Sequence, residues 1–251
     1  GGTVSVPFVD MTLSMMRAFS TDCFSSSFAS SRIEIESEGY RDDDFDFVVE
    51  PDATAASYFL TLPIVAGGRC GLEGIHEVML QGDSAYVEIL REIGVEICRT
   101  NQGIESTMTR EPKGGTFDFN DISDTFLSLA AISPLLSSPL TINGIAHTRK
   151  QETDRVAAMA TELRKLGQGV EESEDQLHIS PNLNKLMQLA ANGVEIDTYK
   201  DHRFAMSFGI LGCCDLLENG KSWLRINDPN CCAKTFPGFF DKLEYVRRIS
   251  H

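Results

Sequence analysis

Residues 86–97 read Tyr-Val-Glu-Ile-Leu-Arg-Glu-Ile-Gly-Val-Glu-Ile. The apolar side chains at 86, 89, 90 and 93 recur at the spacing of a helix that buries one face. Gly94 is typical of a helix end, and the alternating residues after it are typical of a strand. The stretch therefore predicts a helix followed directly by a strand, which is a building block of α/β folds.

The same pattern occurs more than once along the chain. A second copy places apolar residues at Val156, Met159, Ala160 and Leu163 before Gly167 and Val170, and an imperfect earlier copy has Met11, Met15 and Phe19. Short strand-like stretches follow each copy, and then comes a nearly all-apolar helix that begins near Asp52, Asp124 or Asp201. A helix that is apolar on every side is buried on every side. We therefore expect repeated α/β units with helices inside and sheets outside.

An aspartate at the start of each buried helix has two explanations. Aspartate is a good N-cap, and its charge suits the positive end of the helix dipole. For Asp52 this explanation fits best, whereas Asp124 and Asp201 fit a cap and a functional role equally well. If the three helix N-termini open on one cleft, their unpaired N–H groups would form a strong anion site.

Two charged segments support such a site. They are Lys-Gln-Glu-Thr-Asp-Arg at 150–155 and Lys-Asp-His-Arg at 200–203, each at the start of a helical pattern. Arginine offers a bidentate fork to carboxylate or phosphate, and a carboxylate among cations is poised for proton transfer. Although the chain carries a net charge of −15, we expect a local basic pocket formed by Arg149, Lys150, Arg155, Arg203 and Lys234.

Composition narrows the classes of function. A net charge of −15 argues against nucleic acid or an anionic membrane as a partner. The N-terminus has no signal-peptide pattern, and no apolar run is long enough to span a membrane. The seven cysteines include no Cys-x-x-Cys pair, so we expect reduced, mostly buried thiols and no structural metal. The acidic runs at 42–46 and 171–175 fit solvated loops, and residues 20–46 fit hairpin strands with a variable loop.

Several segments of the chain resemble the 5-enolpyruvylshikimate-3-phosphate synthase family. The most specific are Glu-Thr-Asp-Arg at 152–155, Thr-Glu-Leu-Arg-Lys-Leu-Gly at 161–167 and Asp-His-Arg at 201–203. Others are Val-Ser-Val-Pro at 4–7, Glu-Pro-Asp-Ala at 50–53, Leu-Gln-Gly-Asp at 80–83 and Ala-Lys-Thr-Phe-Pro at 233–237, all in the family's order. The resemblance implies an enolpyruvyl transferase-like inside-out barrel of βαβαββ-type units.

The resemblance covers only the C-terminal part of the family's usual length, so we expect the fold to be incomplete. It implies that residues 1–48 form the last unit of the upper domain and that residues 49–251 form the lower domain. The front part of the family carries further substrate-binding residues, among them a Lys-Ser pair and an arginine. A complementary N-terminal segment is therefore a possible partner.

The resemblance also implies roles for individual residues in the transfer of the enolpyruvyl group from phosphoenolpyruvate to shikimate 3-phosphate. Asp124 matches the acceptor of the 5-hydroxyl proton, and Glu152 matches the acid/base residue that serves the methylene carbon. Arg155 and Arg203 match the pair that holds the phosphoenolpyruvate carboxylate, and Lys234 matches the lysine near its phosphate. The reaction needs a base on the hydroxyl and an acid at the methylene carbon, so these residue types suit it.

The remaining matches concern His202 and the shikimate 3-phosphate site. His202 is the neighbour of the second arginine and a catalytic candidate, and Ser5 matches a ligand of the shikimate phosphate. His147 stands where some members have asparagine, and Gln151 stands where the family often has lysine, with Lys150 one place earlier. Which of Lys150 and Gln151 contacts the substrate stays open. In addition, Phe8 replaces a frequent tyrosine beside the shikimate ring.

The expected protein is a cytoplasmic enzyme that needs neither metal nor organic cofactor. Two alternatives stay open. One is the related transferase that acts on UDP-N-acetylglucosamine, whose usual reactive cysteine would lie in the missing front part. The other is a folded but inactive fragment that requires a complementary segment, because one wall of the substrate cleft is absent.

Overall fold

The structure, a computed structural model, describes residues 6–20, 25–29, 32–36 and 39–249. Its helices are α1 (Val6–Phe19), α2 (Ala53–Ala66), α3 (Tyr86–Ile93), α4 (Phe126–Ile132), α5 (Arg155–Lys165), α6 (Leu183–Ala190), α7 (His202–Leu211) and α8 (Phe239–Ile249). Its strands are β1 (Ser25–Ala29), β2 (Arg32–Glu36), β3 (Arg69–Glu73), β4 (Val95–Arg99), β5 (Gly103–Met108), β6 (Thr116–Asp118), β7 (Leu140–Asn143), β8 (Gly169–Glu172), β9 (Gln176–Ser180), β10 (Val194–Ile196) and β11 (Leu224–Ile226).

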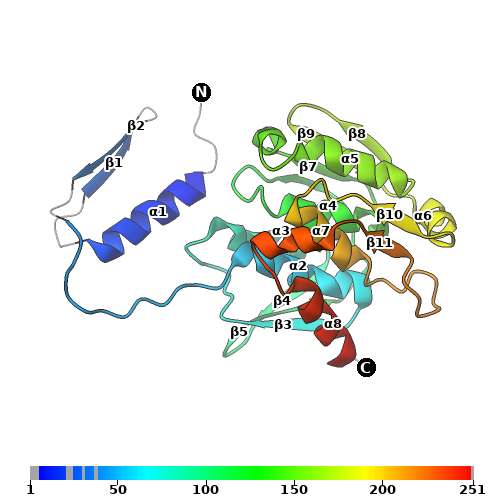
Figure 1. Ribbon diagram of the computed structural model, residues 1–251, viewed down its shortest axis with the longest axis horizontal. Coiled ribbons are helices and arrows are strands. Elements are labelled where there is room, and N and C mark those ends of the chain that lie inside the picture. The colour runs from blue at the N-terminus through cyan, green and yellow to red at the C-terminus, as the bar shows by residue number, and fades with distance from the viewer. Residues whose placement is uncertain (1–5, 21–24, 30–31, 37–38, 250–251) are drawn as a thin grey trace.

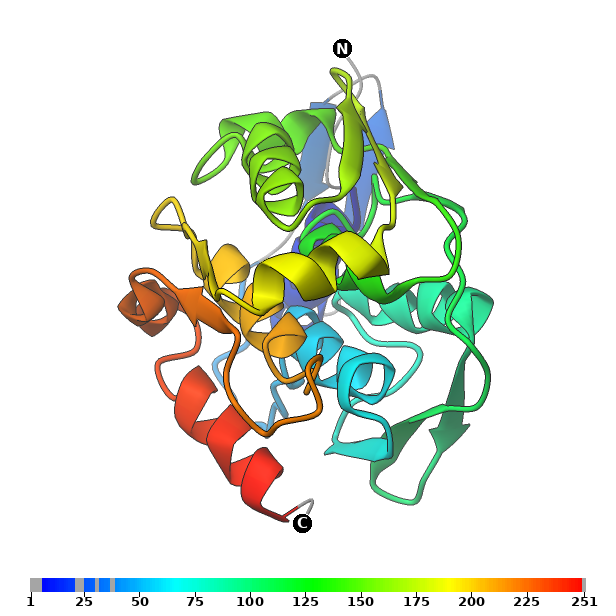
Figure 2. The same ribbon diagram turned by 90° about the vertical axis from the view of Figure 1, so that its right-hand side faces the viewer.

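The three helices α2, α4 and α7 form the centre of the body and contact one another. All residues of α4 are buried, and so are all residues of α7 except Arg203. Both views place the sheets at the periphery around these helices (Figure 1, Figure 2). The predicted α/β arrangement, with buried helices inside and sheets outside, is confirmed.

The body has three peripheral sheets, which differ in their number of strands. Strands β3-β5-β4 form an antiparallel sheet, and β6-β7-β9-β8 form a mixed sheet in which only β6 and β7 run parallel. The third sheet consists of β10 and β11 alone, paired in parallel. Within the described residues the sheets do not close into a barrel, so the fold is an incomplete one.

The amphipathic helices begin and end where the sequence predicts. Helix α3 spans residues 86–93 and ends at Gly94, which has a φ of 121°. Glycine adopts such a positive φ at little steric cost because it has no Cβ. Helix α5 is followed by Gly167 with φ 79°, so the second copy of the pattern ends in the same way. The short helix α6 was not predicted, because its pattern of apolar residues is brief and follows a proline-asparagine turn.

The N-terminal part lies beside the body in Figure 1, joined to it by an extended segment. It consists of α1 and the antiparallel hairpin β1–β2, so the predicted hairpin within residues 20–46 is confirmed. Helix α1 approaches the body near the 3-10 helix η1 (Gly82–Ala85), where a side chain on Gly82 would meet Pro7. None of the helices in the described part of the chain is long and apolar enough to cross a membrane.

The described cysteines are free thiols, but most of them are not buried as predicted. Cys232 is buried and Cys98 is exposed, while the other four lie in partly exposed positions. Of these four, Cys213, Cys214 and Cys231 lie just after α7 and in the surface helix η4 (Pro229–Lys234), whereas Cys70 lies in the edge strand β3. The two acidic runs are exposed as expected, apart from the half-buried Phe45 in the first.

Candidate active site

The N-termini of the central helices converge on one group of charged side chains. Asp52 caps α2 by accepting hydrogen bonds from the N–H groups of Thr54 and Ala55, as its sequence position predicts. Asp201 caps α7 and accepts the N–H of Arg203 at 2.9 Å. Asp124 lies two residues before α4 and is not its cap, so its carboxylate is available for other partners.

Arg155 is the centre of this group. Its side chain is almost fully buried, and its Nε donates to Oδ2 of Asp201 at 2.7 Å. Its Nη1 donates to Oδ1 of Asp124 at 3.0 Å and to the amide oxygen of Gln151. Its Nη2 donates to Oε2 of Glu152 at 2.6 Å. Every nitrogen of this guanidinium is therefore occupied.

Arg203 shares one carboxylate with Arg155. Its Nη2 donates to Oδ2 of Asp124 at 2.6 Å, so Asp124 bridges the two arginines through its two oxygens. Burial opposes the charge of Arg203, but Tyr58 and Asp124 beside it raise its pKa, so the guanidinium stays protonated. The buried Nε of Arg203 and the hydroxyl of Tyr58 have no hydrogen-bond partner of good geometry in the described residues.

Lys234 and Glu152 form the outer edge of the group. Nζ of Lys234 lies 2.5 Å from Oε1 of Glu152, while the other carboxylate oxygen binds Arg155. Partial burial opposes ionisation of Glu152, but the hydrogen bond from Lys234 and the charge of Arg155 outweigh it and lower the pKa of Glu152 to about 2. Glu152 is therefore ionised at neutral pH and can accept a proton but not donate one.

His202 follows the cap residue of α7 and is buried. Its Nδ1 lies 3.7 Å from Oδ1 of Asp201, too far for a hydrogen bond. Burial and the neighbouring charge of Arg203 lower the pKa of His202, although Asp201 acts in the opposite direction. The imidazole is therefore neutral at pH 7, and each of its nitrogens can take part in hydrogen bonding.

The basic pocket predicted from the sequence is not what these contacts form. Three cations, Arg155, Arg203 and Lys234, are paired with the three carboxylates Asp124, Glu152 and Asp201. Arg149 instead binds Asp154 at 2.9 Å and the carbonyls of Ser173 and Glu174. The prediction failed because it counted the cations without the acids that fold against them.

The residues expected at the shikimate 3-phosphate site lie in different surroundings. His147 lies within 2.8 Å of the Ser123 hydroxyl, next to Asp124 in sequence. Lys150 is exposed and makes no hydrogen bond or ion pair within the described residues, whereas Gln151 binds Arg155. Ser5 lies outside the described residues. The choice between Lys150 and Gln151 therefore stays open.

Two residues of the site escaped the sequence-based prediction. Tyr58 lies in α2 with its hydroxyl near Arg203, and burial raises its pKa to about 12. Asp83 is buried beside Thr54 and Gln81, and burial raises its carboxyl pKa to about 6. Tyr58 is hidden in an all-apolar helix pattern, whereas the Leu-Gln-Gly-Asp segment at 80–83 was a signal that could have pointed to Asp83.

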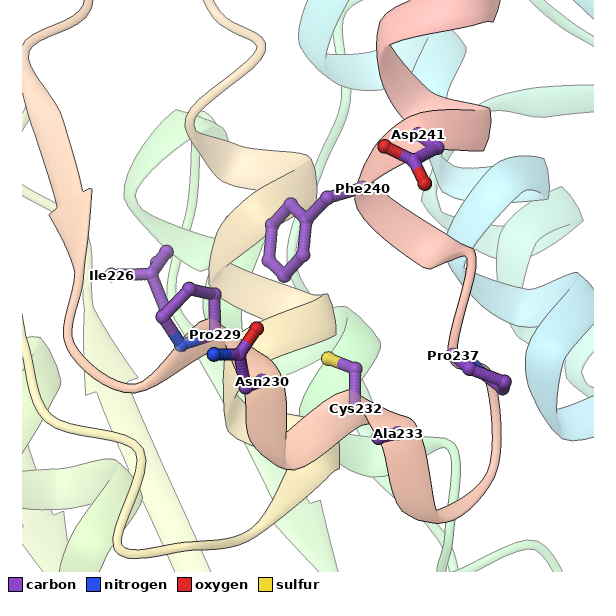
Figure 3. Close-up of a pocket in the computed structure, with 8 residues that line it drawn as sticks. All are labelled: Ile226, Pro229, Asn230, Cys232, Ala233, Pro237, Phe240 and Asp241. Carbon is purple, nitrogen blue, oxygen red and sulfur yellow. The ribbon is translucent and has the colours of Figure 1, made fainter.

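Two cavities lie near the segment that runs from η4 to Phe236. A small one of about 30 Å³ adjoins the charged group and is lined by Asp52, Ala55, Tyr58, His202, Arg203, Met206, Thr235 and Phe236. The larger one, of about 450 Å³, lies between η4 and α8, where Phe240 extends toward Pro229 (Figure 3). Cys232 lines the larger cavity and contacts the His202 carbonyl on its other side, at 3.8 Å. The larger cavity contains none of the predicted site residues.

The comparisons with known proteins agree on one family. A family model described as EPSP synthase (3-phosphoshikimate 1-carboxyvinyltransferase) matches residues 1–243. The 3-phosphoshikimate 1-carboxyvinyltransferase of Opitutus terrae is 46% identical over 97% of this chain and 52% of its own length. The same enzyme of Nostoc punctiforme is 38% identical over 96% of this chain and 53% of its own length. The chain thus spans about half the length of these curated relatives.

Solved structures show the same fold. The EPSP synthase of Acinetobacter baumannii aligns with a TM-score of 0.67 at 22% identity, covering 90% of this chain and 52% of that one. The enolpyruvyl transferase NikO of Streptomyces tendae aligns with a TM-score of 0.63 at 14% identity, covering 95% of this chain and 53% of that one. The incomplete α/β fold therefore corresponds to about half of an enolpyruvyl transferase.

Proposed function

The chain belongs to the EPSP synthase family, and from this premise we propose that it takes part in transferring the enolpyruvyl group of phosphoenolpyruvate to the 5-hydroxyl of shikimate 3-phosphate, with release of phosphate. The observation that carries the proposal is the bridge from Asp124 to Arg155 and Arg203. It brings a potential base into contact with two cations that suit a carboxylate. Addition of the hydroxyl to the enol phosphate, followed by elimination of phosphate, needs both at one place.

The proposed roles follow from the chemistry of each group. Asp124 accepts the proton of the 5-hydroxyl, and Arg203, with Arg155 behind it, holds the carboxylate of phosphoenolpyruvate. Lys234 meets the phosphate of phosphoenolpyruvate, and Glu152 serves its methylene carbon. His202, neutral and buried beside Arg203, completes the catalytic set. These roles are supported by the ion pairs that directly connect the charged residues of the site.

Substrate binding must rearrange these ion pairs. In the structure Arg203 and Lys234 are already neutralised by Asp124 and Glu152. A phosphate that takes Lys234 away from Glu152 removes the contact that keeps the pKa of Glu152 near 2. The pKa of Glu152 then rises toward the range of a proton donor. In this way the phosphate of phosphoenolpyruvate itself prepares the acid that protonates the methylene carbon.

The proposal includes a division of the chain and a missing wall of the site. Residues 1–48 belong to the upper domain and residues 49–251 to the lower domain, with the substrates between them. The β10–β11 sheet has two strands, whereas the other two sheets of the body have three and four. No third strand pairs with β10 or β11 within the part of the chain that the structure describes, and this, together with coverage of only 52% of a curated relative, supports a complementary front segment. A cytoplasmic location is part of the same proposal.

The decisive experiment measures phosphate release from shikimate 3-phosphate and phosphoenolpyruvate. We expect none from the purified chain and turnover once the front segment of the same protein is added, because the transition state needs donors from both walls. Turnover by the chain alone would show that the front segment is not required. No turnover with the segment present, or turnover only with UDP-N-acetylglucosamine as acceptor, would reject the proposed substrate.

A matched pair of variants then tests the role of Arg203. In the reconstituted enzyme, Arg203→Ala removes hydrogen bonds worth about 1.5–3 kcal/mol each to a charged group, so we expect a loss of about tenfold or more in the use of phosphoenolpyruvate. Binding of shikimate 3-phosphate should change far less. The control is Arg225→Ala, because Arg225 is exposed and pairs only with Glu195 among the described residues. Equal effects of Arg203→Ala on both substrates would refute the assignment.

A further inference from the structure

A fully buried acid, Glu162, lies on α5 outside the contacts described so far. Its residue exposure is 0%, and its Oε1 accepts the hydroxyl of Tyr199 at 2.5 Å. Lys165 lies 2.9 Å from the same oxygen, and the other oxygen accepts the N–H of Asp197 at 3.2 Å. A buried carboxylate is retained only where such partners stabilise it. Glu162 is therefore bonded to residues on both sides of Thr198.

The segment that Glu162 holds has an unusual backbone. Tyr199 and Lys200 have φ angles of 54° and 60°, and neither is glycine. The N–H of Asp201 closes the turn by donating to the carbonyl of Thr198 at 2.8 Å. Consecutive left-handed residues with side chains are unfavourable and persist where their surroundings impose them. The turn directly precedes Asp201 and Arg203, and thus the start of α7.

Helix α5 contacts both ends of this turn. Arg155, at its first residue, binds the carboxylate of Asp201 after the turn, and Glu162, seven residues later on the same face, binds Tyr199 within it. The edge-to-face contact between the rings of Tyr199 and Phe204, with centroids 5.5 Å apart, adds a link to α7 itself. The direction in which α7 begins, and with it the place of Arg203, is therefore fixed from α5.

We propose that Glu162 is a positioning residue that acts through Tyr199 to hold the strained turn, and thereby to place Asp201 and Arg203 for the substrate carboxylate. The part of this inference that concerns the carboxylate rests on the proposed function. The positioning itself is a property of the chain and can be measured without any substrate. It also explains why a glutamate occupies a fully buried position of helix α5.

The test is hydrogen exchange by nitrogen-15 NMR on the whole chain with Tyr199→Phe, which removes only the hydroxyl. The local reporters are the backbone N–H of Arg203 and the Nε–H of Arg155, both bonded to Asp201. The global reporters are the amides of the buried helix α4. We expect the local reporters to exchange about tenfold faster than in the parent, beyond any change in α4. Tyr245→Phe is the control, because Tyr245 is exposed on α8.

A second variant distinguishes a local effect on the turn from a general loss of stability. Glu162→Gln keeps the shape of the side chain and removes its charge, so it should accelerate the same local reporters. Equal acceleration of α4 and Arg203 in both variants would mean that Glu162 merely stabilises the fold, and the proposal would be wrong. Unchanged local reporters would also refute it. Neither outcome bears on phosphate release, so failure of the positioning role is distinguishable from failure of the proposed function.

Discussion

Arg203 and Asp124 are joined by an ion pair with 2.6 Å between Nη2 and Oδ2. The cation expected to hold a substrate carboxylate is thus bound to the carboxylate expected to take a proton. Because Arg155 binds the other oxygen of Asp124, this single side chain holds two arginines in place without substrate. The site is therefore preorganised by its own acids, and each substrate anion must replace one of them.

Removing the charge of Asp124 should destabilise the chain. Asp124→Asn leaves Arg155 and Arg203 with one carboxylate fewer, and breaking a buried pair costs about 3–5 kcal/mol. Since the side chain of Asp124 is 17% exposed, we expect a loss of about 2 kcal/mol in the free energy of unfolding, measured in urea. The exposed Asp121→Asn is the control and should stay within about 0.5 kcal/mol. Equal losses would contradict the bridging role.

The pH dependence of stability should report Glu152. Its folded pKa of about 2 lies below the usual glutamate value of 4.5, so its ionised form stabilises the fold above pH 4.5 and that contribution disappears as the pH falls toward 2. We expect the parent to exceed Glu152→Gln in free energy of unfolding by about 1 kcal/mol at pH 7, a reduced value because solvent reaches the pair, and by nearly nothing near pH 2. A pH-independent difference would argue against this charge network; the exposed Glu111→Gln is the control.

Asp83 should show the opposite dependence. Burial raises its folded pKa from 3.8 to about 6, so the fold favours the protonated acid and loses stability as the pH rises from about 4 to 6. Asp83→Asn removes this penalty while keeping a polar group near Thr54. Urea unfolding should show the parent losing about 2–3 kcal/mol relative to the variant between pH 4 and pH 7. A parent that gains stability relative to Asp83→Asn over this range would contradict a buried, protonated Asp83.

The sequence predicted what depends on neighbours along the chain. The apolar spacing and Gly94 were enough to place helix α3 and its end, and Asp52 was identified as a cap from its position alone. It could not predict the partners of Arg155, because Asp201 lies 46 residues further on and Asp124 lies 31 residues earlier. The family resemblance brought these residues to one site. Whether these residues form an open basic pocket or a neutral network of ion pairs depends on distances between their atoms, which the spacing of residues along the sequence does not give.

The last prediction concerns the strained turn before α7. At Lys200, with φ 60°, a side chain costs about 1–3 kcal/mol, whereas glycine costs about 0.5–1 kcal/mol through the freedom of the unfolded chain. We therefore expect Lys200→Gly to raise the free energy of unfolding in urea by about 1 kcal/mol.

The matched control for that substitution is Lys242→Gly. Lys242 lies exposed within helix α8, where glycine costs about 1 kcal/mol because it frees the backbone of the unfolded chain and no strain is relieved. The two variants remove the same side chain and should change stability in opposite directions. If Lys200→Gly destabilised the chain as much as Lys242→Gly does, the turn would not be under strain. Glu162 and Tyr199 would then not be holding a strained turn, although the hydrogen bond between Glu162 and Asp197 would remain.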